Sequence, residues 1–232
     1  MSLKSFAYYD LTESFSQSGC AVCRLLQRDV ARLLDSILYE YATDRGMQAR
    51  FRASRGLCGK HGWELSRNNN ALGIAILYEQ SLHELLTLLE KPAPVEKAKR
   101  GLGWLFTASS GAALADSLEP VKQCLACETQ STNETAYIRA LADDLSDDAM
   151  LAAFRSSDGL CVEHFRQALR ATTDPARASH LTGVQRDIWT RLRADLLEFM
   201  RKSDYNHADE AMGPEANSWL RAVARLSGEI NK

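Results

Sequence analysis

The sequence predicts an all-α protein, built from two similar helical-hairpin repeats that form a helical bundle. Three observations support this fold class. Apolar residues recur every three or four positions over long stretches, as they do along the buried side of a helix. No convincing alternation of apolar and polar residues predicts a strand. Short motifs of the first half return in the second half at a nearly constant distance, which indicates an internal duplication.

The first half contains five expected helices, at residues 5–18, 20–42, 43–53, 58–67 and 71–90. Thr43 is the expected N-cap of the third helix, with Asp44 in its first turn, because a side-chain oxygen there can accept a free backbone N–H. The fifth helix is apolar at most positions, so it is expected to be buried on most sides. Pro92 and Pro94 should end it.

The second half repeats this plan at an offset near 103 residues. Ser146 and Asp147 stand where Thr43 and Asp44 stand in the first half. A long apolar helix is again expected near residues 181–199, and a last helix should begin at Pro214, which suits a first helical position. The expected organisation is a first repeat at 1–96, a connecting segment at 97–119, and a second repeat with a C-terminal helix at 120–232.

The connecting segment has a basic part followed by an apolar and aromatic part, Gly101 to Phe106. Such a segment could touch a membrane surface. Two glycines and a single short cluster make a poor membrane anchor, so the favoured interpretation is a helix between the repeats that packs its apolar side on the bundle.

Composition and charge exclude several classes of protein. The chain has 232 residues, of which 45% are hydrophobic and 25% charged, as in ordinary globular proteins. The formal charge is −2, so a nucleic-acid partner is not favoured. We expect no membrane span, because no apolar run approaches the roughly 20 residues that one requires. The N-terminus has no apolar signal-peptide core, and a cytoplasmic location with reduced thiols is expected.

The six cysteines all belong to one repeated pattern. A CxxC motif at Cys20 and Cys23 is followed, after 34 intervening residues, by an LCxxH motif. A second CxxC motif is followed by a second LCxxH motif after 33 residues. The eight candidate metal ligands are Cys20, Cys23, Cys58, His61, Cys124, Cys127, Cys161 and His164.

Thiolate sulfur and imidazole nitrogen are the ligands that zinc prefers, usually four in a tetrahedron. Residues three apart at the start of a helix lie on the same side, and the positive end of the helix favours the thiolate. We therefore expect two zinc ions per chain, each held by three cysteines and one histidine. Sites within each repeat are favoured, because a duplication implies an ancestral half with its own site. Ligand pairs that cross between the halves remain an alternative.

Four other interpretations of the motifs compete with zinc. Iron–sulfur clusters could bind the same ligands, although the ferredoxin spacings are absent. A thiol oxidoreductase could use the CxxC pairs, but no strand–helix–strand context surrounds them. Six buried free cysteines would not explain why both motifs occur twice at matched separation. Covalent haem is disfavoured, because Arg24 and Glu128 stand where that motif requires histidine.

The repeated CxxC and LCxxH motifs resemble those of an uncharacterised family of bacterial and archaeal proteins of similar length, classed as a domain of unknown function. The resemblance implies metal binding and supplies no reaction. No nucleophile–base set, P-loop or dinucleotide motif occurs, so an enzyme is not the favoured class. The expected function is a metal-stabilised helical scaffold or interaction module with a protein partner. The sequence predicts neither the identity of that partner nor the oligomeric state.

Overall fold

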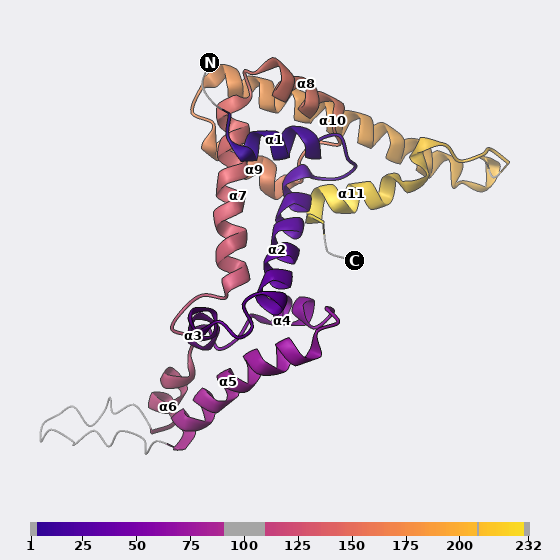
Figure 1. Cartoon of the computed structure of the whole chain (residues 1–232). Coiled ribbons are helices and arrows are strands. Elements are labelled where there is room, and N and C mark those ends of the chain that lie inside the picture. The colour runs from indigo at the N-terminus through magenta and orange to yellow at the C-terminus, as the bar shows by residue number, and fades with distance from the viewer. Residues whose placement is uncertain (1–3, 91–109, 208, 230–232) are drawn as a thin grey trace, which may run out of the picture. The chain divides into compact units, whose positions relative to one another are not determined.

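The structure is a computed structural model that describes residues 4–90, 110–207 and 209–229 (Figure 1). All regular elements of these residues are helices, so the all-α prediction is confirmed. The α-helices are α1 Phe6–Ser14, α2 Ala21–Tyr39, α3 Arg45–Ala53, α4 Gly59–Leu65, α5 Ala71–Glu90, α6 Ser110–Leu118, α7 Leu125–Asp144, α8 Asp148–Ser156, α9 Val162–Ala171, α10 Pro175–Lys202 and α11 Ser218–Ser227. Two short 3₁₀ helices lie at Tyr205–His207 and Pro214–Asn217.

The chain forms two compact units. Unit 1 comprises Met1–Asp29 and Ser131–Lys232, and unit 2 comprises Val30–Gln130. Helices α2 and α7 each begin in one unit and end in the other. Each unit therefore contains residues of both expected repeats. The division of the sequence into repeats at 1–96 and 120–232, joined by 97–119, stays a prediction.

Aspartate side chains begin three of the helices. Asp44 caps α3 by accepting the backbone N–H of Met47, and Asp147 caps α8 by accepting that of Met150. The expected cap at Thr43 was wrong by one residue, because Asp44 has the extended backbone that a cap requires. Asp174 caps α10, whose first position is proline.

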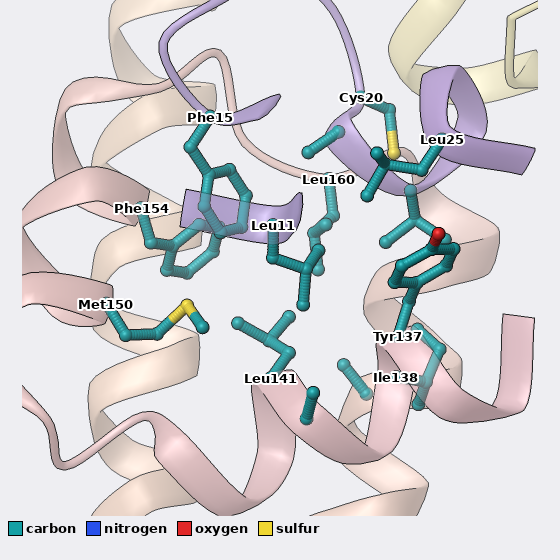
Figure 2. Close-up of a cluster of buried hydrophobic side chains, with 14 of the residues drawn as sticks. Leu11, Phe15, Cys20, Leu25, Tyr137, Ile138, Leu141, Met150, Phe154 and Leu160 are labelled. Carbon is teal, nitrogen blue, oxygen red and sulfur yellow. The ribbon is translucent and has the colours of Figure 1, made fainter. Parts of the chain in front are cut away.

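The core of unit 1 joins α1, the start of α2, the end of α7, and helices α8 to α10 (Figure 2). Leu11 of α1 and Leu141 of α7 are completely buried. The rings of Phe15 and Phe154 pack with their centroids 5.3 Å apart. This core surrounds the first CxxC motif, since Cys20 and Cys23 are themselves among its buried residues.

The core of unit 2 joins the second half of α2 with α3, α4, α5 and the start of α7. Leu34 and Ile37 of α2 are buried against this cluster together with Phe51 of α3. The ring of Phe51 makes an edge-on contact with that of Tyr78 in α5, at a centroid separation of 5.2 Å. Phe51 and Phe154 thus have the same role, each near the end of a short helix in its own unit.

Helix α5 occupies the predicted residues, but the prediction that it is buried on most sides was wrong. Only Gly73, Leu77 and Ser81 are buried. Within the described part of unit 2 the helix packs on α3 and α6, so the opposite side is left uncovered. Its exposed leucines are Leu72, Leu82, Leu86 and Leu89.

The expected connecting segment lies largely outside the described residues. Both interpretations of residues 97–109, as a packed helix or a membrane-touching segment, concern that undescribed part, and the described remainder includes α6. None of the helices in the described ranges is long and apolar enough to cross a bilayer.

Candidate metal centres

The structure brings the eight predicted ligands together in two groups of four. Centre A comprises Cys20, Cys23, Cys161 and His164, and lies in unit 1. Centre B comprises Cys58, His61, Cys124 and Cys127, and lies in unit 2. Each centre joins the CxxC motif of one half of the sequence to the LCxxH motif of the other half. The prediction that each repeat holds its own site was therefore wrong, and the crossed alternative is the observed pairing.

The path of the chain after α2 explains the crossed pairing. Helix α2 has 19 residues and is therefore roughly 28 Å long, with Cys20 and Cys23 at its start. Phe51, Leu65 and Leu77 are buried against the second half of α2, in unit 2. Burial of these side chains keeps α4 in unit 2, so the chain does not return to the first CxxC motif.

In centre A the Nδ1 atom of His164 faces three sulfur atoms. The distances from Nδ1 to Sγ are 3.4 Å for Cys20, 3.4 Å for Cys23 and 3.2 Å for Cys161. The sulfurs of Cys23 and Cys161 lie 3.8 Å apart. All four side chains are buried.

Centre B has the same arrangement. The Nδ1 atom of His61 lies 3.3 Å from the sulfur of Cys58, 3.4 Å from that of Cys127 and 3.7 Å from that of Cys124. The sulfurs of Cys58 and Cys127 are 3.6 Å apart. His61 and Cys124 are buried, whereas Cys58 and Cys127 are partly exposed.

These distances fit four ligands around one ion. All six cysteines are free, and the sulfur separations of 3.6 Å and 3.8 Å far exceed the roughly 2.05 Å of a disulfide. Zinc–sulfur and zinc–nitrogen bonds of about 2.3 Å and 2.0 Å place tetrahedral ligands about 3.8 Å apart for two sulfurs and about 3.5 Å for sulfur and nitrogen. In each centre all four ligand atoms lie within 4.8 Å of one another. Both groups could therefore hold a metal ion.

The local fold places each ligand at the start of a helix. Cys58 and Cys161 are the N-cap residues of α4 and α9, and neither side chain makes a capping hydrogen bond. Their sulfurs are thus left for other partners. Glycines with positive φ, Gly56 at 88° and Gly159 at 78°, allow the tight turns two residues before these caps.

Hydrogen bonds orient the histidine of centre A. The Nε2 atom of His164 lies 3.1 Å from a carboxylate oxygen of Glu134, which also accepts a hydrogen bond from Gln167. If Nε2 carries the proton, the Nδ1 lone pair faces the sulfurs. The hydrogen bond from His164 holds the pKa of Glu134 below its ordinary value.

Two thiols of centre A have pKa values shifted in opposite directions. Hydrogen bonds with Cys161 and Cys20, together with burial, raise the pKa of Cys23 well above the ordinary thiol value. Hydrogen bonds from Cys20 and Cys23, and from His164, lower the pKa of Cys161 well below the ordinary thiol value. Burial disfavours the charged form of His164, but hydrogen bonds with Cys161, Cys20 and Glu134 raise its pKa to about 12. A bound ion would displace the proton from Nδ1 of His164 and from the thiols, because only the deprotonated forms of these groups are ligands.

His61 has no counterpart of Glu134. Its Nε2 atom is buried and has no hydrogen-bond partner among the described residues. The sequence offered no signal for this difference or for Glu134, because a carboxylate 30 residues from its histidine follows no motif. The two centres thus share their ligand sets and differ in the groups that support the histidine.

The comparisons with known proteins identify a family and supply no function. One similar protein is an uncharacterized 23.9 kDa protein in the xynA 3′ region of Caldicellulosiruptor sp. (strain Rt8B.4). It is 23% identical over 220 residues, which cover 94% of this chain and 99% of that protein. No solved structure matches the chain. The model of one family matches residues 56–232, and the chain accordingly belongs to the family of unknown function DUF6062.

Proposed function

We propose that the protein is a zinc-stabilised helical scaffold or interaction module, with one zinc ion in each centre. The observation that supports this most directly is the pair of closed ligand sets, each with three sulfurs and one nitrogen within 4.8 Å. Four protein ligands leave no position for a substrate or water, which is typical of structural rather than catalytic zinc.

The spacing of the ligand atoms favours a single ion over an iron–sulfur cluster. Ligands of different irons must lie farther apart than ligands of one ion, because the bridged cluster stands between them. In both centres the separations agree with a tetrahedron around one zinc. Cysteine and histidine together are also a common ligand set of structural zinc.

Zinc in each centre would join segments that are far apart in the sequence. In centre A it would tie the start of α2 to the start of α9, and in centre B the start of α4 to the start of α7. Metal binding of this kind can supply on the order of 10 kcal/mol of folding free energy. Each compact unit would thereby gain a cross-link in addition to its own apolar core.

An internal duplication is also part of the proposal. Matched features at equivalent positions support it, including the caps Asp44 and Asp147, the buried rings of Phe51 and Phe154, and the N-cap cysteines. Two copies of one half would give the crossed pairing if the CxxC motif of each copy joined the LCxxH motif of the other.

Elemental analysis of protein purified without oxygen tests the proposal. We expect a colourless protein with about two zinc ions per chain, and about one after either His61→Asn or His164→Asn. His180→Asn, which changes an exposed histidine of α10, is the matched control and should keep both ions. A brown protein that contains iron and inorganic sulfide would overturn zinc in favour of clusters. Metal-free protein with reversible CxxC disulfides would instead favour the oxidoreductase.

A further inference from the structure

Helix α11 faces the protein with its polar side. Ser218 and Arg225 are its buried residues, and Arg225 is only 3% exposed. Its large apolar side chains, by contrast, are about half exposed or more, and Leu226 is 72% exposed. The exposed apolar residues are Trp219, Leu220, Val223 and Leu226. Apolar burial therefore contributes little to the docking of α11, which must depend on polar contacts.

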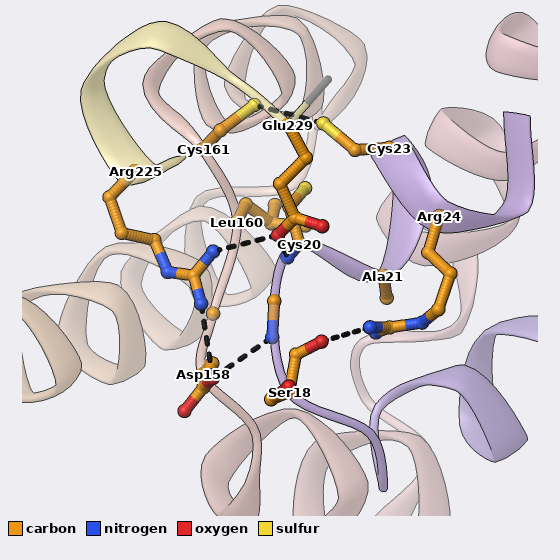
Figure 3. A network of polar contacts seen from close by, with 12 residues as sticks. Ser18, Cys20, Ala21, Cys23, Arg24, Asp158, Leu160, Cys161, Arg225 and Glu229 are labelled. Carbon is orange, nitrogen blue, oxygen red and sulfur yellow. Dashed lines mark hydrogen bonds and ion pairs between the residues drawn. The ribbon is translucent and has the colours of Figure 1, made fainter. Parts of the chain in front are cut away.

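The buried guanidinium of Arg225 is paired with two carboxylates beside centre A (Figure 3). Its nitrogen atoms lie 3.2 Å from an oxygen of Asp158 and 3.3 Å from an oxygen of Glu229. Each carboxylate in turn accepts a backbone N–H of the loop that leads into the first CxxC motif. Asp158 accepts the N–H of Gly19 at 2.9 Å, and Glu229 accepts that of Cys20.

Further contacts bring the end of α11 close to the sulfurs. The side chain of Gln27 in α2 donates to the backbone oxygen of Glu229 at 3.0 Å. A Cβ atom built on Gly228, the residue before Glu229, would lie 4.0 Å from the sulfur of Cys23. A Cβ atom on Gly19 would overlap the carboxylate of Glu229, and φ at Gly19 is +101°, so this approach requires glycine.

In centre B the backbone N–H groups equivalent to those of Gly19 and Cys20 belong to Gln123 and Cys124. Centre B lies in unit 2, whereas Asp158, α11 and Glu229 belong to unit 1 together with centre A. Centre B therefore serves as the internal control for the contacts of α11.

We infer that docking of α11 and metal binding in centre A stabilise each other through Arg225, Asp158 and Glu229. We call α11 with these three residues the latch of centre A. The inference rests on the proposed metal-binding function. The contacts fix the backbone of Gly19 and Cys20 and so hold the Cys20 and Cys23 sulfurs toward Cys161 and His164. A docked latch then raises metal affinity, and by thermodynamic linkage a bound ion must hold the latch in place. Arg225, Asp158 and Glu229 are positioning residues, since none of them is a ligand.

Hydrogen exchange of the full chain loaded with zinc tests whether loss of the metal from centre A loosens α11. Cys161→Ser removes a ligand of centre A, and Cys58→Ser removes the equivalent N-cap ligand of centre B. We expect Cys161→Ser to speed exchange of the α11 amides at least about tenfold, and Cys58→Ser to leave them unchanged. Unchanged α11 exchange in Cys161→Ser protein that has lost one zinc would overturn the latch and leave the proposed function intact.

Measurement of zinc affinity tests whether loss of the α11 contacts weakens metal binding in centre A. In the Cys58→Ser background, Arg225→Ala should weaken zinc binding in centre A about tenfold, as loss of supporting contacts does in other metal sites. The control is Arg201→Ala on α10, because Arg201 also pairs with two carboxylates, Glu198 and Glu210, which belong neither to α11 nor to a metal centre.

If Arg225→Ala does not fold, Glu229→Ala serves instead. Glu229→Gln, which keeps an acceptor oxygen, should then restore part of the zinc affinity. Equal affinity in the latch variants and the control would refute the coupling, and wild-type protein that binds no metal would refute both proposals.

Discussion

At the scale of single residues, the two centres differ most in what supports the ligand histidine. Both rings direct Nδ1 at three sulfurs. Within the described part of the chain, His164 has a carboxylate, Glu134, on its other nitrogen, and His61 has no hydrogen-bond partner there. Such a carboxylate fixes the tautomer and orientation of the ring and increases its basicity as a ligand. His61 has to hold its orientation by packing and by its sulfur contacts.

Glu134→Gln should therefore weaken metal binding in centre A while leaving centre B unaffected. The amide can still accept or donate a hydrogen bond but carries no charge, and we expect a loss of about tenfold in zinc affinity. Competition with a chromogenic chelator in the Cys58→Ser background measures the change. Glu198→Gln is the matched control, because it makes the same change on α10, where Glu198 pairs with Arg201 and Lys202.

Asp147 is a second residue whose role the structure makes testable. Its carboxylate caps α8 and also accepts the hydroxyl of Tyr8 at 2.6 Å, which joins α1 to α8. The hydrogen bond from Tyr8, followed by that from the Met150 amide, lowers the pKa of Asp147 to about 2. A lowered pKa in the folded state means that this contribution to stability is complete above the ordinary value of 3.8 and disappears as the pH falls towards 2.

Asp147→Ala should lower the melting temperature by roughly a few degrees, and more than Asp44→Ala does. Asp44 caps α3 in the same way, whereas the carboxylate of Asp147 also accepts the Tyr8 hydroxyl and pairs with Lys4 at 3.4 Å. The Asp44 variant therefore measures the effect of a cap by itself. Thermal unfolding at pH 7 measures both variants. The difference between them should shrink when the measurement is repeated near pH 2. An equal loss at pH 7 would mean that the Tyr8 contact contributes nothing.

At the scale of helices, the boundaries of a helix could be predicted from local sequence, whereas the side that it buries could not. The boundaries of α5 agree with the apolar run at 71–90. Helix α3 starts at Arg45, two residues after the expected cap Thr43. Burial of α5 was not predictable in this way, because it depends on which helices cover it. Helix α11 shows the same limit, since its periodicity predicts an apolar side that the described structure leaves exposed.

Phe51 and Phe154 offer a matched test of the two cores. Each ring is completely buried, near the end of α3 and α8 respectively. Replacement by alanine should leave a cavity and cost about 3–5 kcal/mol in the unit concerned. Hydrogen exchange resolves the units, so Phe154→Ala should expose amides of α1 and α8, and Phe51→Ala those of α3 and α5. The control Phe6→Ala, which changes a side chain that is 92% exposed, should alter neither unit; uniform effects across both units would contradict the division of the cores.

At the scale of the whole molecule, the ligands were predictable and their pairing was not. CxxC and LCxxH each place two side chains on one helix start, which is a local property of the sequence. Which CxxC meets which LCxxH depends on the direction the chain takes after α2 and α7, and that is set by the burial of side chains such as Phe51 and Leu65. The preference for sites within a repeat assumed a return of the chain that this packing does not allow.

The order in which the centres lose metal follows from the same differences. All four ligands of centre A are buried, and Glu134 and the end of α11 support them. In centre B, Cys58 and Cys127 are partly exposed and the Nε2 atom of His61 lacks a partner among the described residues. A chelator or acid can reach exposed thiolates first, because release requires their protonation or displacement. We therefore expect centre B to release its zinc first.

Variants that retain one centre can establish this order. Cys161→Ser protein retains centre B and should release its zinc at a higher pH and a lower chelator concentration than Cys58→Ser protein, which retains centre A. We expect a difference of about tenfold in the chelator concentration at half release, comparable to the effect of one supporting contact. In protein that combines Glu134→Gln with Cys58→Ser, centre A should release its zinc at a chelator concentration closer to that of centre B. Release from centre A before centre B would show that burial and the Glu134 contact do not govern metal retention in this fold.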